Sequence, residues 1–329
     1  MKTILNKLFE QHRLTKEEAK EVLIQIANEK FNKSHLASFL TVFMVRPISV
    51  EELAGFREAL LELAVKVDLS DFNTIDLCGT GGDGKNTFNI STLTSFVVAG
   101  TGNKVAKHGN YGVSSVSGSS NMLEYLGYKF TNEESALKRQ IEKANICFLH
   151  APLFHPAMKA VGPVRKELGL KTFFNMLGPL VNPSNPQNQL VGVFNLEVAR
   201  IYNYLLQDTP KNYGIVYSLD GYDEISLTSA FKLFTKENEA LISPEELGLK
   251  TLKQSEIYGG DSVADSAKIF LAILDGKGTE AQNNAVLTNA AFALKTFDHN
   301  KSFEEAFEEA KSSLLGLKAK ESLTKLIAN

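Results

Sequence analysis

From about residue 70 onward, short apolar runs alternate with stretches of helical periodicity, and this alternation restricts the possible fold more than any other feature of the chain. The runs have the length of buried strands and lie at 74–78, 104–106, 146–149, 190–194 and 214–217. The helical patterns lie at about 91–99, 119–126, 132–144 and 197–207, the third with Thr131 as its expected cap and Glu134 behind it. The alternation predicts an α/β fold with a mainly parallel central sheet flanked by helices.

The first 70 residues have helical patterns only. Thr15 with Glu18, and Ser49 with Glu52, match the capping box that starts a helix, and Ser34 is a candidate cap for a helix between them. A further helix-like segment lies around 163–169, and amphipathic helices return from about 279. We predict a small all-helical domain made of residues 1–70 and completed by about 163–188. The α/β domain is then expected over residues 71–329.

Composition excludes several classes of protein. The net charge of −3 and the pI of about 6.1 give no overall positive field to hold nucleic acid or an anionic membrane. The two cysteines, Cys78 and Cys147, have neither disulfide-framework nor metal-ligand spacing, which is typical of a reduced, intracellular protein. Polar residues interrupt the N-terminus before a signal region develops, and no apolar run approaches the length of a membrane span. We therefore expect a cytoplasmic protein.

A glycine-rich segment follows the first strand run directly. It has the sequence GTGGDG at 79–84 and continues with TFNIST at 87–92. Glycines allow positive φ and bring backbone N–H groups close to a phosphate, and a helix starting near Ser91 adds unpaired N–H donors. A tight turn between strand and helix needs fewer than four glycines in six residues. The segment therefore predicts a phosphate-binding loop.

Two nucleotide-binding motifs fit this segment only in part. The glycines of 79–84 satisfy GxGxxG, but a dinucleotide fold needs the helix to open inside the motif and an acidic residue about 20 positions later, after the next strand. The strand run at 104–106 is followed by basic residues instead. The pattern GxxxxGK is met up to Lys85, but Asn86 stands where a Ser or Thr hydroxyl must ligate Mg²⁺. Neither motif is therefore predicted to function here.

A second polar loop follows the second strand run. Residues 107–120 hold a lysine, a histidine, an asparagine, five serines and three glycines, and a helical pattern starts next to them. This loop supplies a cation and hydroxyl donors, where the first supplies mainly backbone N–H groups. Parallel strands bring such loops to one edge of the sheet. Two of them suit a ligand with two separated phosphate groups.

These segments together resemble the anthranilate phosphoribosyltransferase family of the tryptophan pathway. The matching motifs are GTGGDG at 79–84, TFNIST at 87–92, KHGN at 107–110, and Ser114-Ser115 with Gly118-Ser119. Later matches are HPAMK at 155–159, PVR at 163–165, FNMLGPL at 174–180 with Asn182-Pro183, and DEIS at 223–226. The resemblance covers nearly the whole chain in the order of the family. It implies transfer of a phosphoribosyl group from phosphoribosyl pyrophosphate to the amine of anthranilate, with Mg²⁺ as cofactor, in a homodimer built through the helical domain.

The resemblance also implies site residues, position by position. The expected contacts of phosphoribosyl pyrophosphate are Gly79, Gly82, Asp83, Thr87, Asn89, Ile90, Ser91, Thr92, Lys107, His108, Gly109, Asn110, Ser114, Ser115 and Ser119. The expected Mg²⁺ ligands are Ser91, Asp223 and Glu224, and the expected anthranilate contacts are Gly79, Asn110 and Arg165. Lys107, Asn110 and Arg165 are the expected catalytic residues. Tyr111 and Asn121 depart from the arginine and the aspartate usual in the family, so no role is assigned to either.

Several of these residues have a simpler interpretation. Asp223 and Glu224 alone would be typical of a solvated turn, and Arg165, beside a lysine and a glutamate, could be a surface charge. His108 and His155 could each orient a loop rather than touch a substrate.

Two other functions stay open at this stage. A pyrimidine-nucleoside phosphorylase has a similar fold and Lys-His-Gly loop but usually carries a further C-terminal domain. A non-enzymatic relative that binds nucleic acid should have a basic surface and eroded metal residues, whereas this chain is acidic and keeps Asp223 and Glu224.

Overall fold

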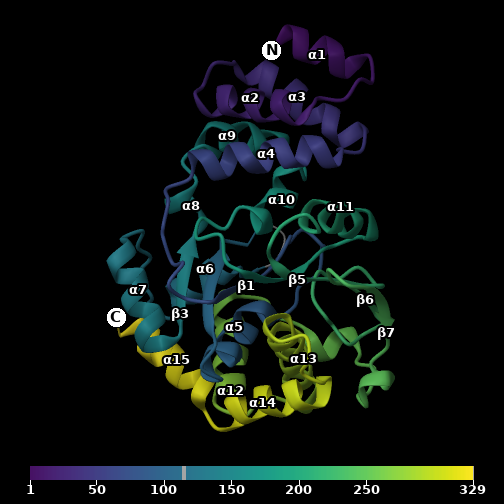
Figure 1. Ribbon diagram of the computed structural model, residues 1–329. Coiled ribbons are helices and arrows are strands. Elements are labelled where there is room, and N and C mark those ends of the chain that lie inside the picture. Colours follow the sequence, from purple (N-terminus) through teal and green to yellow (C-terminus); the bar gives the residue numbers. More distant parts are fainter. Residues whose placement is uncertain (113–115, 329) are drawn as a thin grey trace. The chain divides into compact units, whose positions relative to one another are not determined.

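The computed structural model describes residues 1–112 and 116–328 and divides the chain into two compact units. The first unit consists of Met1–Lys66 and Ala151–Asn185, and the second of Val67–His150 and Pro186–Asn329 (Figure 1). The chain therefore leaves the first unit, forms part of the second and returns. In the part of the chain that the structure describes, no helix is long and apolar enough to cross a membrane.

The first unit is entirely helical. The capping boxes at Thr15 and Ser49 form as predicted, whereas Asn32, and not Ser34, caps the helix between them through a hydrogen bond from the His35 N–H. The helices are α1 (Lys2–Phe9), α2 (Lys16–Ala27), α3 (Lys33–Val45), α4 (Val50–Leu63), α8 (Ala151–Phe154), α9 (Met158–Leu168) and α10 (Phe174–Leu177), followed by the short 3₁₀ turn η1 (Gly178–Leu180).

The returning segment of this unit contributes to the core of the first four helices. The ring of Phe173 stacks on Phe56 at 4.5 Å between centroids and meets Phe39 and Phe43 edge-on. Helix α9 packs against α2 and α3. The segment starts at Ala151, which is earlier than residue 163, the start expected from sequence. Phe154 belongs to this unit because its carbonyl accepts a hydrogen bond from the Val65 N–H at 2.8 Å.

A buried ion pair holds the start of α4. The carboxylate of Glu52 is fully buried and accepts hydrogen bonds from both terminal nitrogens of Arg46 and from the backbone N–H groups of Leu14 and Ser49. Burial raises the pKa of Glu52, but these donors outweigh it and lower the pKa below its usual range. A buried carboxylate with four donors is satisfied, so it holds the α1–α2 connection to α4 without an unpaired charge.

The second unit is built on a seven-stranded sheet. The strand order is β3-β2-β1-β4-β5-β6-β7, parallel through β5 and antiparallel for the last two strands. The strands are β1 (Thr74–Gly79), β2 (Lys104–Gly109), β3 (Ile146–His150), β4 (Asn188–Gly192), β5 (Asn212–Ser218), β6 (Phe231–Phe234) and β7 (Glu239–Ile242). The five parallel strands were predicted, and the mainly parallel α/β fold is confirmed. The fourth ends at Gly192 rather than at residue 194.

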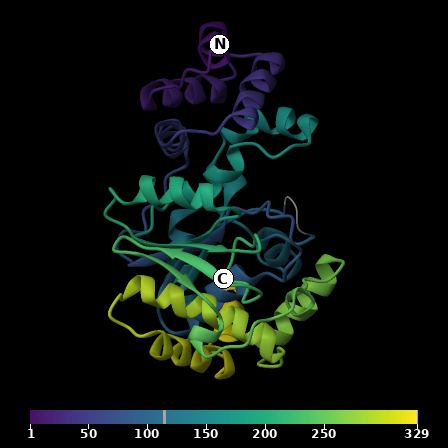
Figure 2. The ribbon, with the colours of Figure 1, turned by 90° about the vertical axis from the view of Figure 1, so that its right-hand side faces the viewer.

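Helices cover both faces of this sheet. In the turned view, α11 lies on one side of the strands and α13 with α14 on the other (Figure 2). The third predicted helix starts at Glu134, because the Thr131 hydroxyl accepts from the Glu133 N–H two residues ahead and does not cap it. The helices are α5 (Ile90–Gly100), α6 (Ser119–Tyr125), α7 (Glu134–Ala144), α11 (Leu196–Leu206), α12 (Val263–Leu274), α13 (Glu280–Phe297), α14 (Phe303–Leu315) and α15 (Lys318–Ile327), with 3₁₀ turns η2 (Glu245–Leu247) and η3 (Gln254–Ile257).

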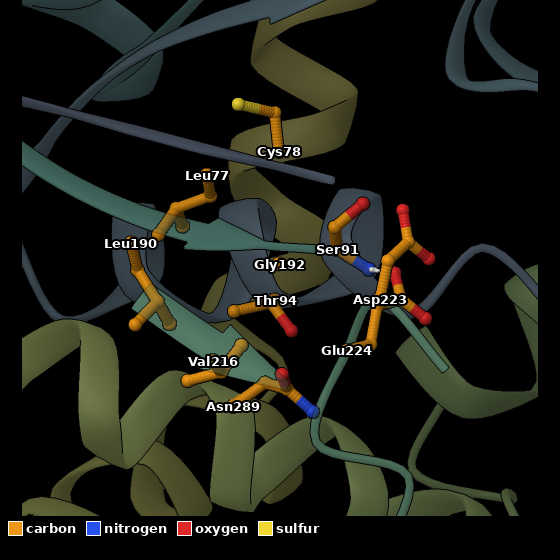
Figure 3. A pocket seen from close by; sticks show the side chains of 10 residues that line it. All are labelled: Leu77, Cys78, Ser91, Thr94, Leu190, Gly192, Val216, Asp223, Glu224 and Asn289. Carbon is orange, nitrogen blue, oxygen red and sulfur yellow. Dashed lines mark hydrogen bonds between the residues drawn. The ribbon is translucent and has the colours of Figure 1, made fainter. Parts of the chain in front are cut away.

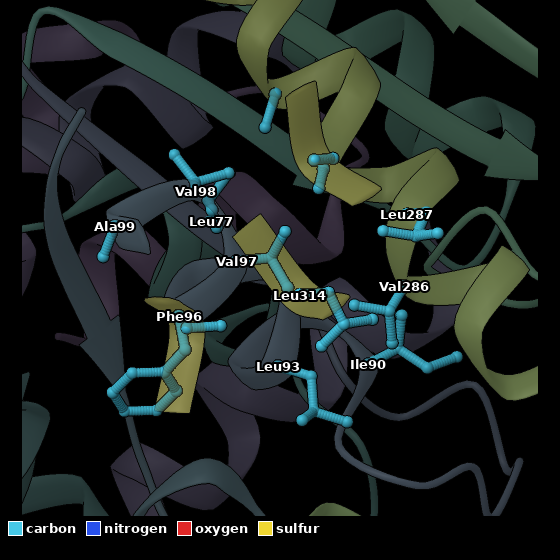
Figure 4. Packing of buried hydrophobic residues seen from close by; sticks show 14 of the residues in the cluster. Leu77, Ile90, Leu93, Phe96, Val97, Val98, Ala99, Val286, Leu287 and Leu314 are labelled. Atoms are coloured by element: carbon cyan, nitrogen blue, oxygen red, sulfur yellow. The ribbon is translucent and has the colours of Figure 1, made fainter. Parts of the chain in front are cut away.

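Helix α5 is buried on nearly every side. Leu93, Phe96 and Val97 belong to one buried cluster with Val286 of α13 and Leu314 of α14 (Figure 4), and the Phe96 ring meets Phe270 of α12 edge-on. Its outer end is also covered, since α15 packs along it. A helix whose apolar and small hydroxyl side chains are buried on nearly every side is a core helix. The N-terminus of α5, which follows the glycine-rich loop, is therefore a fixed point from which the candidate site is built.

Candidate active site

The carboxyl ends of β1, β2, β4 and β5 lie along one edge of the sheet. Gly79, at the end of β1, pairs in register with Gly192 at the end of β4, and Gly192 pairs with Val216 of β5. Three of these strands lead into loops: 80–89 after β1, 110–118 after β2, and 219–230 after β5. The first two are the predicted phosphate loops, and the third carries Asp223 and Glu224.

The first loop has the backbone that its glycines allow. Gly81, Gly82 and Gly84 have φ between +64° and +75°, the left-handed region that other residues rarely adopt. The Gly81 N–H donates to Oδ2 of Asp223 at 2.6 Å, so the loop is tied to the acidic loop after β5. The glycine-rich sequence is therefore needed for the observed path of the chain.

The start of α5 is occupied by a carboxylate. Oε1 of Glu224 accepts from the Ser91 N–H at 2.9 Å, so one of the donors expected for a phosphate is already engaged. Asn89 occupies the cap position without capping; its Nδ2 donates instead to the Ser117 carbonyl at 2.8 Å, which joins the two predicted phosphate loops. Oδ1 of Asn89 is buried and has no hydrogen-bond partner among the described residues.

The second loop starts from two buried residues at the end of β2. Lys107 is only 2% exposed, and its ammonium group donates to the Leu77 carbonyl inside the sheet. Burial lowers the pKa of Lys107, and the charges of Asp76 and Glu224 oppose that shift. The His108 N–H donates to Oδ1 of Asp76 at 3.0 Å. The positive charge thus lies behind the strand ends rather than in the open loop.

The two described ends of the second loop are hydrogen-bonded to the start of α6. The Asn110 carbonyl accepts from the Ser120 N–H at 3.1 Å and from the Ser119 hydroxyl at 3.3 Å. Oδ1 of Asn121 accepts from the N–H groups of Gly112 and Gly118, so this residue joins the two ends of the loop. The Tyr111 hydroxyl donates to Glu124 at 3.3 Å. Ser114 and Ser115, both expected at the site, lie outside the described residues.

The Asp223–Glu224 pair is held from several directions. A Cβ on Gly79 would lie 2.3 Å from Oδ2 of Asp223, and a Cβ on Gly192 would lie 1.5 Å from its carbonyl oxygen. The Ser218 hydroxyl donates to the Glu224 carbonyl at 2.6 Å. These close approaches and this hydrogen bond fix the backbone of the pair, and both residues are half-buried.

A small pocket lies between these elements. Ser91 and Glu224 are side by side on one part of its wall, and Cys78 and Leu77 form another (Figure 3). The residues lining it are Leu77, Cys78, Ser91, Thr94, Leu190, Gly192, Val216, Asp223, Glu224 and Asn289. The pocket thus brings Ser91 together with Asp223 and Glu224, as the family resemblance implies.

Asn289 and Gly192 are among the residues of the pocket wall that were not predicted from sequence. The Asn289 side chain donates to the Ile225 carbonyl at 2.8 Å and accepts from its N–H at 3.1 Å, fixing the backbone next to Glu224. Nothing in the amphipathic pattern of its helix sets Asn289 apart. Gly192 had a signal, because a glycine inside an apolar strand run often marks a close backbone approach.

The acidic groups of this pocket fit a hard divalent cation. Burial and then the charge of Asp83 raise the pKa of Asp223, and burial and then the charge of Asp223 raise that of Glu224. Among the described residues, no group of three or more His, Cys, Asp or Glu is arranged to hold a metal ion alone. Two carboxylates and the Ser91 hydroxyl nevertheless suit Mg²⁺, which commonly takes its remaining ligands from water and substrate phosphates.

Arg165 belongs to the helical unit and lies on α9. Its guanidinium is half-buried, lies over the Phe174 ring at 5.4 Å and donates weakly to Oδ1 of Asn175 at 3.4 Å. Its Nε has no hydrogen-bond partner among the described residues. Burial lowers the pKa of Arg165. His155, in the same unit, is 3% exposed. Arg165 is therefore more enclosed than a surface charge.

Comparison with known proteins matches both parts of the chain. A model described as the α/β domain of a glycosyl transferase family matches residues 71–319, and the helical bundle domain of a glycosyl transferase family matches residues 2–64. The anthranilate phosphoribosyltransferase of Flavobacterium johnsoniae is 62% identical over 326 residues, covering 99% of this chain and 98% of that protein. The chain belongs to the anthranilate phosphoribosyltransferase family. The Bacteroides fragilis member is 54% identical over 327 residues, and the match covers 99% of each chain.

Solved structures of anthranilate phosphoribosyltransferases have the same fold. The crystal structure of the Thermus thermophilus enzyme matches with a TM-score of 0.91 at 31% identity and 98% coverage of both chains. The Saccharomyces cerevisiae enzyme in complex with PRPP and Mg matches with a TM-score of 0.90 at 28% identity, over 98% of this chain and 96% of that one. The predicted fold class, family and enzyme class are confirmed.

Proposed function

We propose that this chain transfers the 5-phosphoribosyl group of phosphoribosyl pyrophosphate to the amine of anthranilate, in tryptophan biosynthesis. The C1–N bond forms, the bond from C1 to the pyrophosphate oxygen breaks, and the amine loses a proton. The observation that carries this proposal is the hydrogen bonding of Asp223 to the glycine-rich loop and of Glu224 to the start of α5, at the carboxyl ends of the strands. Family membership supplies the substrates.

The reaction requires the protein mainly to position the substrates and to stabilise charge. An arylamine is neutral at pH 7, so it needs little help from a general base, and the barrier lies in losing pyrophosphate through a state with positive charge on the sugar. Preorganised donors and bound substrates lower such a barrier. The glycine-rich loop and the loop from Lys107 to Ser119 are proposed to hold the phosphates through backbone N–H and side-chain donors. The buried ammonium of Lys107 adds positive charge behind them.

The cofactor proposed for this site is Mg²⁺. Ser91, Asp223 and Glu224 would hold it, and it would supply positive charge to the pyrophosphate oxygens. The proposal is supported by the hard oxygen donors and the mutual repulsion of the carboxylates around Asp223. The yeast relative in complex with PRPP and Mg supports it independently.

Anthranilate is proposed to contact Gly79, Asn110 and Arg165. Its carboxylate requires a cation, and arginine presents a planar pair of donors that matches a carboxylate. Arg165 has no carboxylate partner within the ranges that the structure describes, and its Nε is unpaired there. A half-buried guanidinium without an ion pair is suited to an anionic ligand.

Replacing Arg165 with alanine should weaken the use of anthranilate. The change removes a charge-assisted hydrogen bond, so kcat/KM for anthranilate should fall about tenfold to a hundredfold, or about 1.5–3 kcal/mol, with little change in the KM for phosphoribosyl pyrophosphate. Arg165→Lys should recover part of the loss, because an ammonium keeps the charge without the fork. Lys107→Met should instead weaken the use of phosphoribosyl pyrophosphate and leave the KM for anthranilate nearly unchanged.

Steady-state kinetics with one substrate varied and the other saturating separates these effects. Lys166→Ala, which removes an exposed charge next to Arg165 on the same helix, is the matched control. An unchanged anthranilate constant in Arg165→Ala would place the acceptor site elsewhere.

The proposed reaction is tested by following the fluorescence of anthranilate, which should be lost when phosphoribosyl pyrophosphate and Mg²⁺ are both present. Phosphorolysis of thymidine or uridine, with no loss of anthranilate, would favour the pyrimidine-nucleoside phosphorylase alternative. Binding of nucleic acid without either reaction would favour a non-enzymatic relative. The homodimer and the cytoplasmic location remain predictions, which sedimentation and cell fractionation test.

A further inference from the structure

The second half of the glycine-rich loop is paired with a segment about 170 positions later in the chain. We call residues 86–88 the loop limb and residues 257–260 the strap. The Gly259 N–H donates to the Asn86 carbonyl at 2.8 Å, and the Phe88 N–H donates to the Ile257 carbonyl at 3.3 Å. The limb and the strap thus form a short antiparallel bridge, centred on Thr87 and Tyr258.

The side chain of Asn86 adds a third link. Its Nδ2 donates to the Gly260 carbonyl at 2.8 Å. This is the position where a Walker loop would carry a hydroxyl for Mg²⁺. Here the residue hydrogen-bonds to another part of the protein, so an amide at this position has a use that the phosphate motif does not require.

The strap approaches the limb so closely that a side chain cannot fit between them. A Cβ on Gly259 would lie 2.4 Å from the Thr87 carbonyl oxygen and 2.8 Å from the Phe88 nitrogen. Both are backbone atoms, which cannot rotate away. Gly259 is therefore required for contact rather than for an unusual φ.

The strap is itself fixed to the core. Ile257 is fully buried, and the Ser266 hydroxyl of α12 donates to the Gly259 carbonyl at 2.5 Å. Phe88, at the other side of the bridge, is 1% exposed. The limb thus rests on a rigid support, although a loop of four glycines would otherwise have many conformations.

We propose that Asn86 and Gly259 are positioning residues, which hold the loop limb so that Thr87 and Asn89 meet the phosphates of phosphoribosyl pyrophosphate. The proposal rests on the proposed function of the loop. Neither residue needs to touch the substrate, because Gly259 has no side chain and the Asn86 amide is engaged by Gly260. Their effect should therefore appear in the binding of phosphoribosyl pyrophosphate and not in the use of anthranilate.

Asn86→Ala and Gly259→Ala test this from the two sides of the bridge. In calorimetry with Mg²⁺, both should bind phosphoribosyl pyrophosphate about tenfold more weakly, by analogy with the outer-shell partners of metal ligands, whose loss costs about 10–100-fold in metal affinity or activity. Both should raise its KM, with kcat and the anthranilate KM nearly unchanged. Asn86→Gln, which keeps the amide donor, should recover part of the affinity.

Gly100→Ala is the matched control. A Cβ there would lie 2.2 Å from the Ser313 hydroxyl and 2.7 Å from the Ala319 nitrogen, at the far end of α5, so it crowds the same unit away from the limb. Thermal unfolding shows which variants fold. If Gly259→Ala does not fold, Asn86→Ala alone tests the inference. If the variants bind phosphoribosyl pyrophosphate as tightly as the wild type, or if Gly100→Ala weakens binding equally, the inference is wrong and the proposed function is unaffected. A wild-type chain that binds no phosphoribosyl pyrophosphate overturns the proposed function and the inference with it.

Discussion

Replacing Asp223 with asparagine and Glu224 with glutamine together should remove most of the turnover while the chain stays folded. Each amide keeps a carbonyl oxygen that can accept from the Gly81 or the Ser91 N–H, so the loop contacts persist. What is lost is two anionic oxygens for Mg²⁺. Loss of one group that stabilises charge in a transition state costs about 10²–10³ in kcat, and a loss at the upper end of that range is expected here.

The same substitution should not destabilise the ligand-free chain. The two carboxylates repel each other and Asp83, and this repulsion destabilises the wild type when no cation is bound. Removing the two charges removes that repulsion. The melting temperature without ligands should therefore be equal to or above that of the wild type. The rise in melting temperature on adding phosphoribosyl pyrophosphate with Mg²⁺ should largely disappear.

Asp220→Asn is the control for this experiment. Asp220 lies in the same loop, but its carboxylate accepts from the hydroxyls of Thr228 and Ser229 rather than facing the pocket. It should keep most of the wild-type activity. Full activity of the double variant in excess EDTA would reject the metal assignment.

The parallel strands could be predicted because each is a buried apolar run bounded by polar residues. Strands β6 and β7 were not, since each has four residues and β7 alternates between exposed and half-buried positions. Local capping chemistry was predicted at Thr15 and Ser49, where the box is complete. It failed at Ser34, because Asn32, two residues earlier, offers an equally good acceptor.

The loops of the site could be located from sequence, but their supports could not. The glycines of 79–84 and the acids at 223–224 are local patterns, whereas Asn289 and Gly259 act through contacts with residues far away in the chain. No periodicity or motif connects Asn86 with Gly260. Residues that bind a ligand can thus be predicted from their chemistry and local motif. The residues that hold them in place can be identified only in the folded structure.

Gly192→Ala should reduce activity severely, although it adds only a single methyl group. Its Cβ would lie 1.5 Å from the Asp223 carbonyl oxygen and 2.4 Å from its carbonyl carbon. Neither the strand β4 backbone, paired on both sides, nor a peptide carbonyl can yield by rotation. The loop that carries Asp223 and Glu224 must move away by more than about 1 Å, and displacements of about 1 Å at a reacting centre cost about 100-fold in rate.

Gly214→Ala, on the neighbouring strand β5, separates this effect from crowding of the sheet. Its Cβ would meet Cδ1 of Leu190 at 2.8 Å, the end of a flexible side chain, so the neighbour can adjust at a cost of about 1–3 kcal/mol in stability. Gly214→Ala should therefore lower the melting temperature with kcat/KM nearly unchanged. Gly192→Ala should lower kcat/KM about 100-fold and raise the Mg²⁺ concentration needed for half-maximal activity. If the two variants lose activity equally, the position of the acidic loop does not depend on Gly192.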